Sequence, residues 1–144
     1  MIPYPSTKKQ NPFVEAKMTY RLDRLVERQA EFHLDFPIFL TGGIGTDFEF
    51  CLEEVRRKVG ATHPTPMILF GDPEYWRQKI TPRFQANLQA GTIKGSEWIS
   101  NCWYCIQTAQ EGLAIYEAFF KGALPIGPNA PSNKDGFVIV KGKG

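Results

Sequence analysis

The sequence is poor in cysteine and histidine, and it contains no long apolar run. Three cysteines without a secretion signal do not suggest a disulfide framework, because their odd number leaves at least one thiol unpaired. No apolar stretch approaches the roughly 20 residues that a membrane-spanning helix needs. The first residues, MIPYPSTKKQ, carry proline and lysine where a signal peptide has an apolar segment. We therefore expect a cytoplasmic protein.

Two of the cysteines, Cys102 and Cys105, are spaced as CxxC, but the spacing alone predicts neither redox chemistry nor a metal site. A thioredoxin-like motif opens a helix, whereas these residues lie in an aromatic run that is typical of a strand. One CxxC also supplies only half of a structural zinc site, and His33 and His63 stand at no matching spacing. We expect buried, unreactive thiols, with no metal and no cofactor.

An excess of charge of one sign is also missing. The 17 basic and 15 acidic residues give a formal net charge of +2, and the basic residues are scattered along the chain. This balance does not favour a nucleic-acid-binding surface. With 144 residues, of which 42% are hydrophobic, the chain is long and apolar enough to bury a core of its own.

Helical and strand-like apolar patterns alternate along the chain. Short continuous apolar runs, typical of strands buried on both faces, are separated by segments with helical spacing. The alternation predicts an α/β protein with a parallel sheet of about three strands flanked by helices. The strands are expected at 36–40, 66–71 and 103–106, and helices from Met18, after the glycines at 42–45, from Pro73, at 82–91 as a second piece, and from a capping box at Thr108–Glu111.

Three segments follow from these patterns. Residues 1–16 are polar and contain three prolines, so they predict an extended N-terminal arm. Residues 17–122 hold the predicted helices and strands, and residues 123–144 form a tail rich in proline and glycine. The end of this tail either pairs as an edge strand or packs loosely. A sheet of three strands leaves an apolar edge uncovered, so self-association is expected.

The stretch FLTGGIGTDFE (39–49) places three glycines between a predicted strand and a predicted helix. It is neither a Walker A loop nor a dinucleotide-binding fingerprint, because the lysine of the first and the third glycine of the second are missing. Glycines here either satisfy a tight strand-to-helix turn or let a phosphate approach the helix N-terminus. The spacing leaves both interpretations open.

The segment GGIGTDFE (42–49) resembles the P-G-G-x-G-T-x-x-E signature of the Lonely Guy (LOG) family, also known as "lysine decarboxylase-like", with Thr41 in place of the proline. Upstream, MTYRLDRL (18–25) is similar to the M-H-x-R-K-x-x-M helix of the family, with Thr19 and Leu22 in place of histidine and lysine. The branch that the chain resembles most comprises the pyrimidine/purine nucleotide 5′-monophosphate nucleosidases. The resemblance covers only the C-terminal part of the family's domain. It therefore implies that residues 17–122 are the C-terminal part of a Rossmann-like nucleotide-binding domain, with a partial doubly wound sheet.

The resemblance implies a nucleosidase that hydrolyses the N-glycosidic bond of nucleoside 5′-monophosphates to a free base and ribose 5-phosphate. Positive charge develops on the ribose during this reaction, so a carboxylate that stabilises it and activates water suits the chemistry. Glu49 matches the family's motif glutamate, and Arg21 matches its arginine, whose guanidinium suits phosphate or ribose hydroxyls. The phosphate-binding residues would be Gly42, Gly43, Ile44, Gly45 and Thr46.

Strands that precede this region in the family have no counterpart in the sequence, so we expect a truncated or weakly active form. The alternative is a non-catalytic nucleotide- or phosphate-binding module. The expected partners are a nucleoside monophosphate and further copies of the chain in a homo-oligomer, and neither a nucleic acid nor a membrane.

Overall fold

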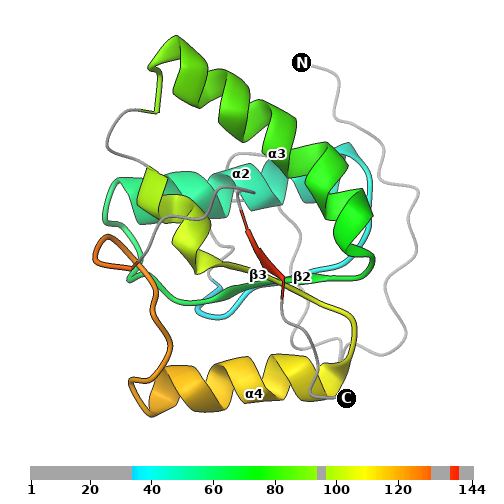
Figure 1. Ribbon diagram of the computed structural model, residues 1–144, viewed down its shortest axis with the longest axis vertical. Helices are drawn as coiled ribbons and strands as arrows, with labels where there is room; N and C mark the ends of the chain where they lie inside the picture. The colour runs from blue at the N-terminus through cyan, green and yellow to red at the C-terminus, as the bar shows by residue number, and fades with distance from the viewer. Residues whose placement is uncertain (1–33, 94–96, 131–136, 140–144) are drawn as a thin grey trace, which may run out of the picture. The chain divides into compact units, whose positions relative to one another are not determined.

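A parallel β-sheet organises the fold (Figure 1). The structure is a computed structural model that describes residues 34–93, 97–130 and 137–139. Its strands are Ile38–Phe39 (β1), Met67–Phe70 (β2), Trp103–Ile106 (β3) and Val138–Ile139 (β4), all parallel and in the order β1-β2-β3-β4. The three predicted strands are confirmed. The end of the tail pairs with β3 as an edge strand, which decides between the two possibilities that the sequence left open.

Helices cover both faces of the sheet, as the doubly wound prediction requires. Helices α2 (Ile44–Lys58) and α3 (Pro73–Ala90) lie on one face, and α4 (Ala109–Phe120) lies on the other (Figure 1). A short 3-10 helix, η2 (Glu97–Cys102), leads into β3. Within the described ranges, no helix is long and apolar enough to cross a membrane.

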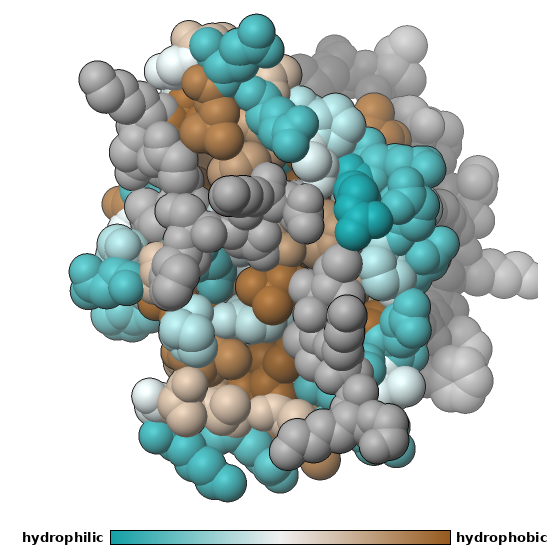
Figure 2. Space-filling model, viewed as in Figure 1, coloured by the Kyte–Doolittle hydropathy of each residue, from teal (hydrophilic) through white to brown (hydrophobic). Residues whose placement is uncertain are grey.

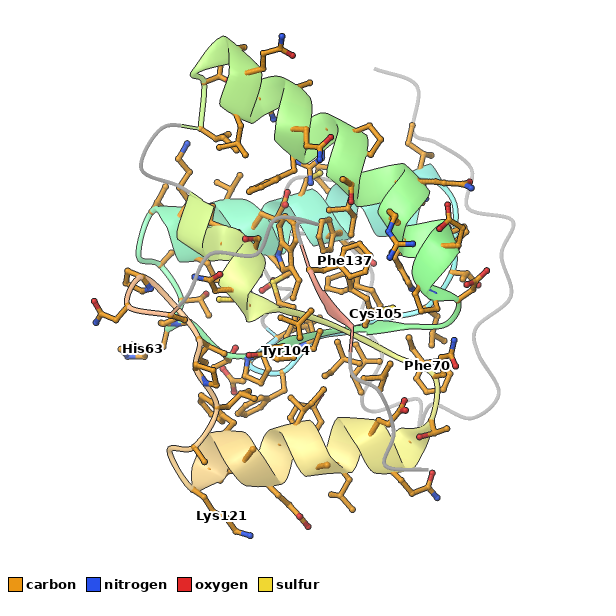
Figure 3. All side chains as sticks on the ribbon, viewed as in Figure 1. His63, Phe70, Tyr104, Cys105, Lys121 and Phe137 are labelled. Carbon is orange, nitrogen blue, oxygen red and sulfur yellow. The ribbon has the colours of Figure 1, made fainter. Side chains whose placement is uncertain are left out.

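Alternate residues of the strands build two separate apolar clusters, because successive strand side chains point to opposite faces. Towards α2 and α3, Met67 and Leu69 pack with Trp103 and Cys105. Phe137, just before β4, completes this cluster and lies on the same side of the sheet (Figure 3). The cluster on the α4 side holds Ile68, Tyr104, Ile106 and Ile115, and the space-filling view shows apolar residues gathered in this layer above a hydrophilic lower rim (Figure 2).

The starts of α3 and α4 follow from their capping residues. The Asp72 side chain accepts a hydrogen bond from the Glu74 backbone N–H at 3.0 Å, with Pro73 in the first helical position. The predicted capping box is confirmed, since Thr108 accepts from the Glu111 N–H and the Glu111 carboxylate accepts from the Thr108 N–H.

The prediction of two helical pieces at 73–91 is wrong, because α3 continues through Pro82 to Ala90. Proline removes one backbone donor and normally kinks a helix. Here the buried side chains Trp76, Ile80 and Phe84 stand on the same side of α3, on both sides of the proline, and anchor the helix to the core. Continuous apolar packing therefore outweighs the local helix-breaking preference.

Helix α2 buries charged side chains and exposes apolar ones. Glu53 and Arg57 are each 1% exposed and form an ion pair of 2.8 Å between Oε2 and Nη1. Arg57 also donates from Nη2 to the Thr65 hydroxyl at 2.8 Å and from Nε to the Thr65 carbonyl. Buried charges are tolerated when they are paired and hydrogen-bonded in this way. The opposite side of the helix carries the α2 row, four exposed side chains that we define as Ile44, Phe48, Val55 and Val59.

Part of the predicted tail is held against η2 and β3. The Asn101 side-chain amide donates to the carbonyls of Gly127 and Ala130, at 3.2 and 2.9 Å. The Tyr104 hydroxyl donates to the Pro125 carbonyl at 3.1 Å. The predicted arm at 1–16 and the helix predicted from Met18 lie outside the described residues.

Candidate functional site

The glycine turn joins the carboxyl end of β1 to the N-terminus of α2. In parallel α/β sheets this edge is where ligands bind. Gly43 is the N-cap of α2, and no side chain caps the helix. Within the part of the chain that the structure describes, the backbone N–H groups of the first helical residues are therefore satisfied neither by the helix nor by a capping side chain. Gly43, Ile44 and Gly45 are exposed, and Ile44 is 88% exposed.

The structure gives different reasons for glycine at positions 42, 43 and 45. A Cβ added at Gly42 would overlap the Thr46 hydroxyl oxygen and lie 3.0 Å from Thr46 Cβ, so this position has no room for a side chain. A Cβ at Gly43 or Gly45 would meet no described atom within 4 Å. All three glycines lack the positive φ that favours glycine. Backbone geometry therefore does not explain Gly43 and Gly45, and what their missing side chains provide is open space over the helix N-terminus.

Two residues of α3 that sequence reasoning missed hold the turn in place. The Tyr75 hydroxyl accepts a hydrogen bond from the Gly42 N–H at 3.2 Å and donates to the Gly42 carbonyl at 2.9 Å. Lys79 Nζ donates to the same carbonyl and to the Tyr75 hydroxyl, both at 3.1 Å. Side chains of α3 therefore hold the turn in place through the backbone N–H and carbonyl of Gly42.

Lys79 also places a positive charge beside the N-terminus of α2. Its ammonium group forms an ion pair with Asp47, which the sequence analysis did not include among the site residues. The hydrogen bonds to Asp47 and Tyr75 raise the pKa of Lys79, so the group stays charged at neutral pH. A signal for this arrangement exists in the sequence. Tyr75 and Lys79 stand four residues apart in the first turns of the helix after β2, whose carboxyl end adjoins that of β1.

Glu49 lies in the second turn of α2, five residues after the first helical residue, Ile44. It is half-buried, and within the described ranges it has no hydrogen-bond or ion-pair partner. Thr46 and Glu49 are three residues apart, so they occupy neighbouring positions on one side of the helix. The structure therefore brings Gly42, Gly43, Gly45, Thr46 and Glu49 together at one helix end. Arg21, the second predicted catalytic residue, lies outside the described residues.

The cysteines are free thiols, and Cys102 and Cys105 are buried. Burial raises the pKa of Cys102 and raises the pKa of Cys105 to about 11, so both remain protonated at neutral pH. Both thiols are therefore buried and protonated, as expected for the CxxC pair. Within the ranges that the structure describes, no three histidine, cysteine, aspartate or glutamate side chains are grouped closely enough to hold a metal ion.

Comparison with known proteins gives no family to which the chain is assigned. No protein-family model matches the sequence, and neither the curated proteins nor the solved structures contain a match.

Proposed function

We propose that the protein is a nucleoside 5′-monophosphate nucleosidase that hydrolyses the N-glycosidic bond to release a free base and ribose 5-phosphate. The observation that carries the proposal is the N-terminus of α2, which has no capping side chain, lies open above Gly43 and Gly45, and places Glu49 nearby on the same helix. A phosphate accepts hydrogen bonds from such backbone N–H groups and is favoured by the helix dipole. The resemblance of residues 42–49 to the LOG signature gives this geometry its substrate class.

The charges around the turn are compatible with an anion. Asp47 would repel a phosphate, but its charge is balanced by Lys79. The partial positive charge of the first backbone N–H groups of α2 then remains to attract the phosphate. We propose that the 5′-phosphate binds to the backbone of residues 43–46, with the Thr46 hydroxyl as an additional donor.

Glu49 is the proposed catalytic carboxylate. It would stabilise the positive charge that develops on the ribose and orient the attacking water. Its helix holds it at a fixed separation from the phosphate-binding N–H groups. This separation would position the glycosidic bond, and such positioning supplies a large part of the lowering of a catalytic barrier. Arg21 remains a proposed second catalytic residue on the strength of the motif alone.

The test is to incubate the protein with AMP, GMP, CMP and UMP and to measure free base by chromatography. Base release that depends on Glu49 is expected, so Glu49→Gln should lower the rate at least a hundredfold while leaving nucleotide binding nearly unchanged. Unchanged turnover in Glu49→Gln would remove this residue from the mechanism. Nucleotide binding without base release would favour the alternative, a non-catalytic nucleotide-binding module.

We also propose that a second copy of the chain packs on the α2 row. Such a row of apolar side chains on one side of a helix normally faces another packed surface. These four side chains are 45–88% exposed, so the same row of a second copy would bury them. Sedimentation equilibrium tests this, with Phe48→Glu expected to weaken self-association at least tenfold. Phe120→Glu, an exposed residue of α4, is the matched control and should have no effect.

A further inference from the structure

A pocket lies between α2 and α3, away from the glycine turn. It has a volume of about 160 Å³ and is bordered by the second half of each helix and by the first residue of β3. Glu54, one of its lining residues, is ten residues after Ile44, which corresponds to about 15 Å along α2. The pocket and the candidate active site are therefore separate.

Aromatic and aliphatic side chains form most of the pocket wall. The rings of Phe84 and Trp103 pack edge to face, with their centroids 6.0 Å apart, and both side chains are buried. Ile99 is a further buried wall residue, while Val55 is 53% exposed and stands at the opening. A cavity of about 150 Å³ with apolar walls is large enough for benzene. The pocket therefore has room for a single planar ring.

One side of the pocket is polar and carries both hydrogen-bond donors and an acceptor. Glu54 is a buried carboxylate, and its Oε1 accepts from Arg83 Nη2 at 2.8 Å. Burial raises the pKa of Glu54, while the hydrogen bond from Arg83 opposes this shift. The Arg83 side chain is 42% exposed, so it can move towards solvent without disturbing the core. Asn87, one helical turn further along α3, adds an amide to the wall.

These groups select the chemistry of a ligand. The Glu54 carboxylate accepts from a ring N–H or an exocyclic amino group, whereas Arg83 and Asn87 donate to a neighbouring ring nitrogen or carbonyl oxygen. A hydrocarbon ring would fill the same space but would offer no hydrogen bonds to the polar groups of the wall. We propose that this pocket binds a planar, single-ring nitrogen heterocycle of the size of a free pyrimidine base, with its polar edge on Glu54 and Arg83. The proposal does not depend on the nucleosidase function.

The experiment is a ligand-observed NMR titration of the full chain with cytosine, uracil and benzene. Two variants form a matched pair. Val55→Trp covers the opening of the pocket, whereas Val59→Trp adds the same side chain four residues later in the α2 row, where it does not line the pocket. Effects that act through self-association would be shared by both. We expect Val55→Trp to weaken binding of the heterocycle at least tenfold and Val59→Trp to change it less than twofold.

Glu54→Gln tests the polar edge, with a tenfold weaker affinity expected for cytosine and little change for benzene. If circular dichroism shows that this variant is unfolded, Arg83→Gln tests the same edge from the more exposed partner. The proposal is overturned if neither heterocycle binds the folded protein, or if Val55→Trp binds as well as the unaltered chain. It is also overturned if benzene binds as tightly as cytosine, because the pocket would then be an apolar cavity only. Loss of base release in the nucleosidase assay has no bearing on any of these outcomes.

Discussion

Replacing Gly45 by alanine should stabilise the fold and impair the site at the same time. Gly45 is in the first turn of α2, its φ is not positive, and an added Cβ would meet no described atom within 4 Å. Alanine is preferred to glycine inside a helix by about 0.5–1 kcal/mol. For a chain of this size we expect the melting temperature to rise by about 1–4 °C. The same Cβ points towards the N-terminal side of the helix, where the phosphate is proposed to bind.

The assay combines thermal unfolding, followed by circular dichroism, with calorimetric titration of ribose 5-phosphate. Gly45→Ala should bind the ligand at least tenfold more weakly, since the added Cβ would occupy part of the open space above the helix N-terminus that the phosphate and ribose are proposed to fill. Gly42→Ala is the control with the opposite sign, because its Cβ would overlap the Thr46 side chain and should lower the melting temperature. A lower melting temperature for Gly45→Ala, or unchanged binding of ribose 5-phosphate, would refute the reasoning.

Two further predictions concern the buried groups. Arg57→Met should lower the free energy of unfolding in urea by about 3 kcal/mol, because the Thr65 hydroxyl loses its donor and Glu53 keeps only its ion pair with Arg56. The control, Arg77→Met, breaks the exposed ion pair with Glu74 and should cost less than about 1 kcal/mol. Equal losses in the two variants would contradict the assigned role of Arg57. Since burial raises the pKa of Cys105 to about 11, its thiol should stabilise the fold fully below its unfolded pKa near 9, and this contribution should fade as the pH rises from about 9 to 11. A Cys105→Ala variant should lack this part of the pH dependence of the unfolding free energy. If the variant shows the same pH dependence as the unaltered chain, the Cys105 thiol does not make this contribution.

The elements that sequence reasoning predicted well have local causes. Short apolar runs between turn residues locate β2 and β3, because a strand buried on both faces must be apolar throughout. The Asp72 cap and the Thr108–Glu111 capping box locate two helix starts, because each depends on residues within a few positions of one another. The glycine turn belongs to the same class, since a strand, three glycines and a helix follow directly along the chain.

The rest depends on contacts between distant residues. The side of α2 that faces the core contains Glu53 and Arg57, and no hydropathy pattern predicts that a charged pair is buried while Phe48 and Val59 are exposed. The hydrogen bonds from Tyr75 to Gly42 join residues 33 positions apart. They exist only because parallel pairing of β1 with β2 brings the ends of these strands together.

The central claim is that the turn at Gly43–Thr46 binds the phosphate of a nucleotide, and NMR chemical shifts test it directly. In a titration of the ¹⁵N-labelled protein with CMP, the backbone amide signals of Gly43, Ile44, Gly45 and Thr46 are predicted to shift most and to saturate. Cytidine, which lacks the phosphate, should leave these four signals in place at the same concentration. Equal shifts with cytidine, or CMP-dependent shifts confined to other parts of the chain, would contradict the claim.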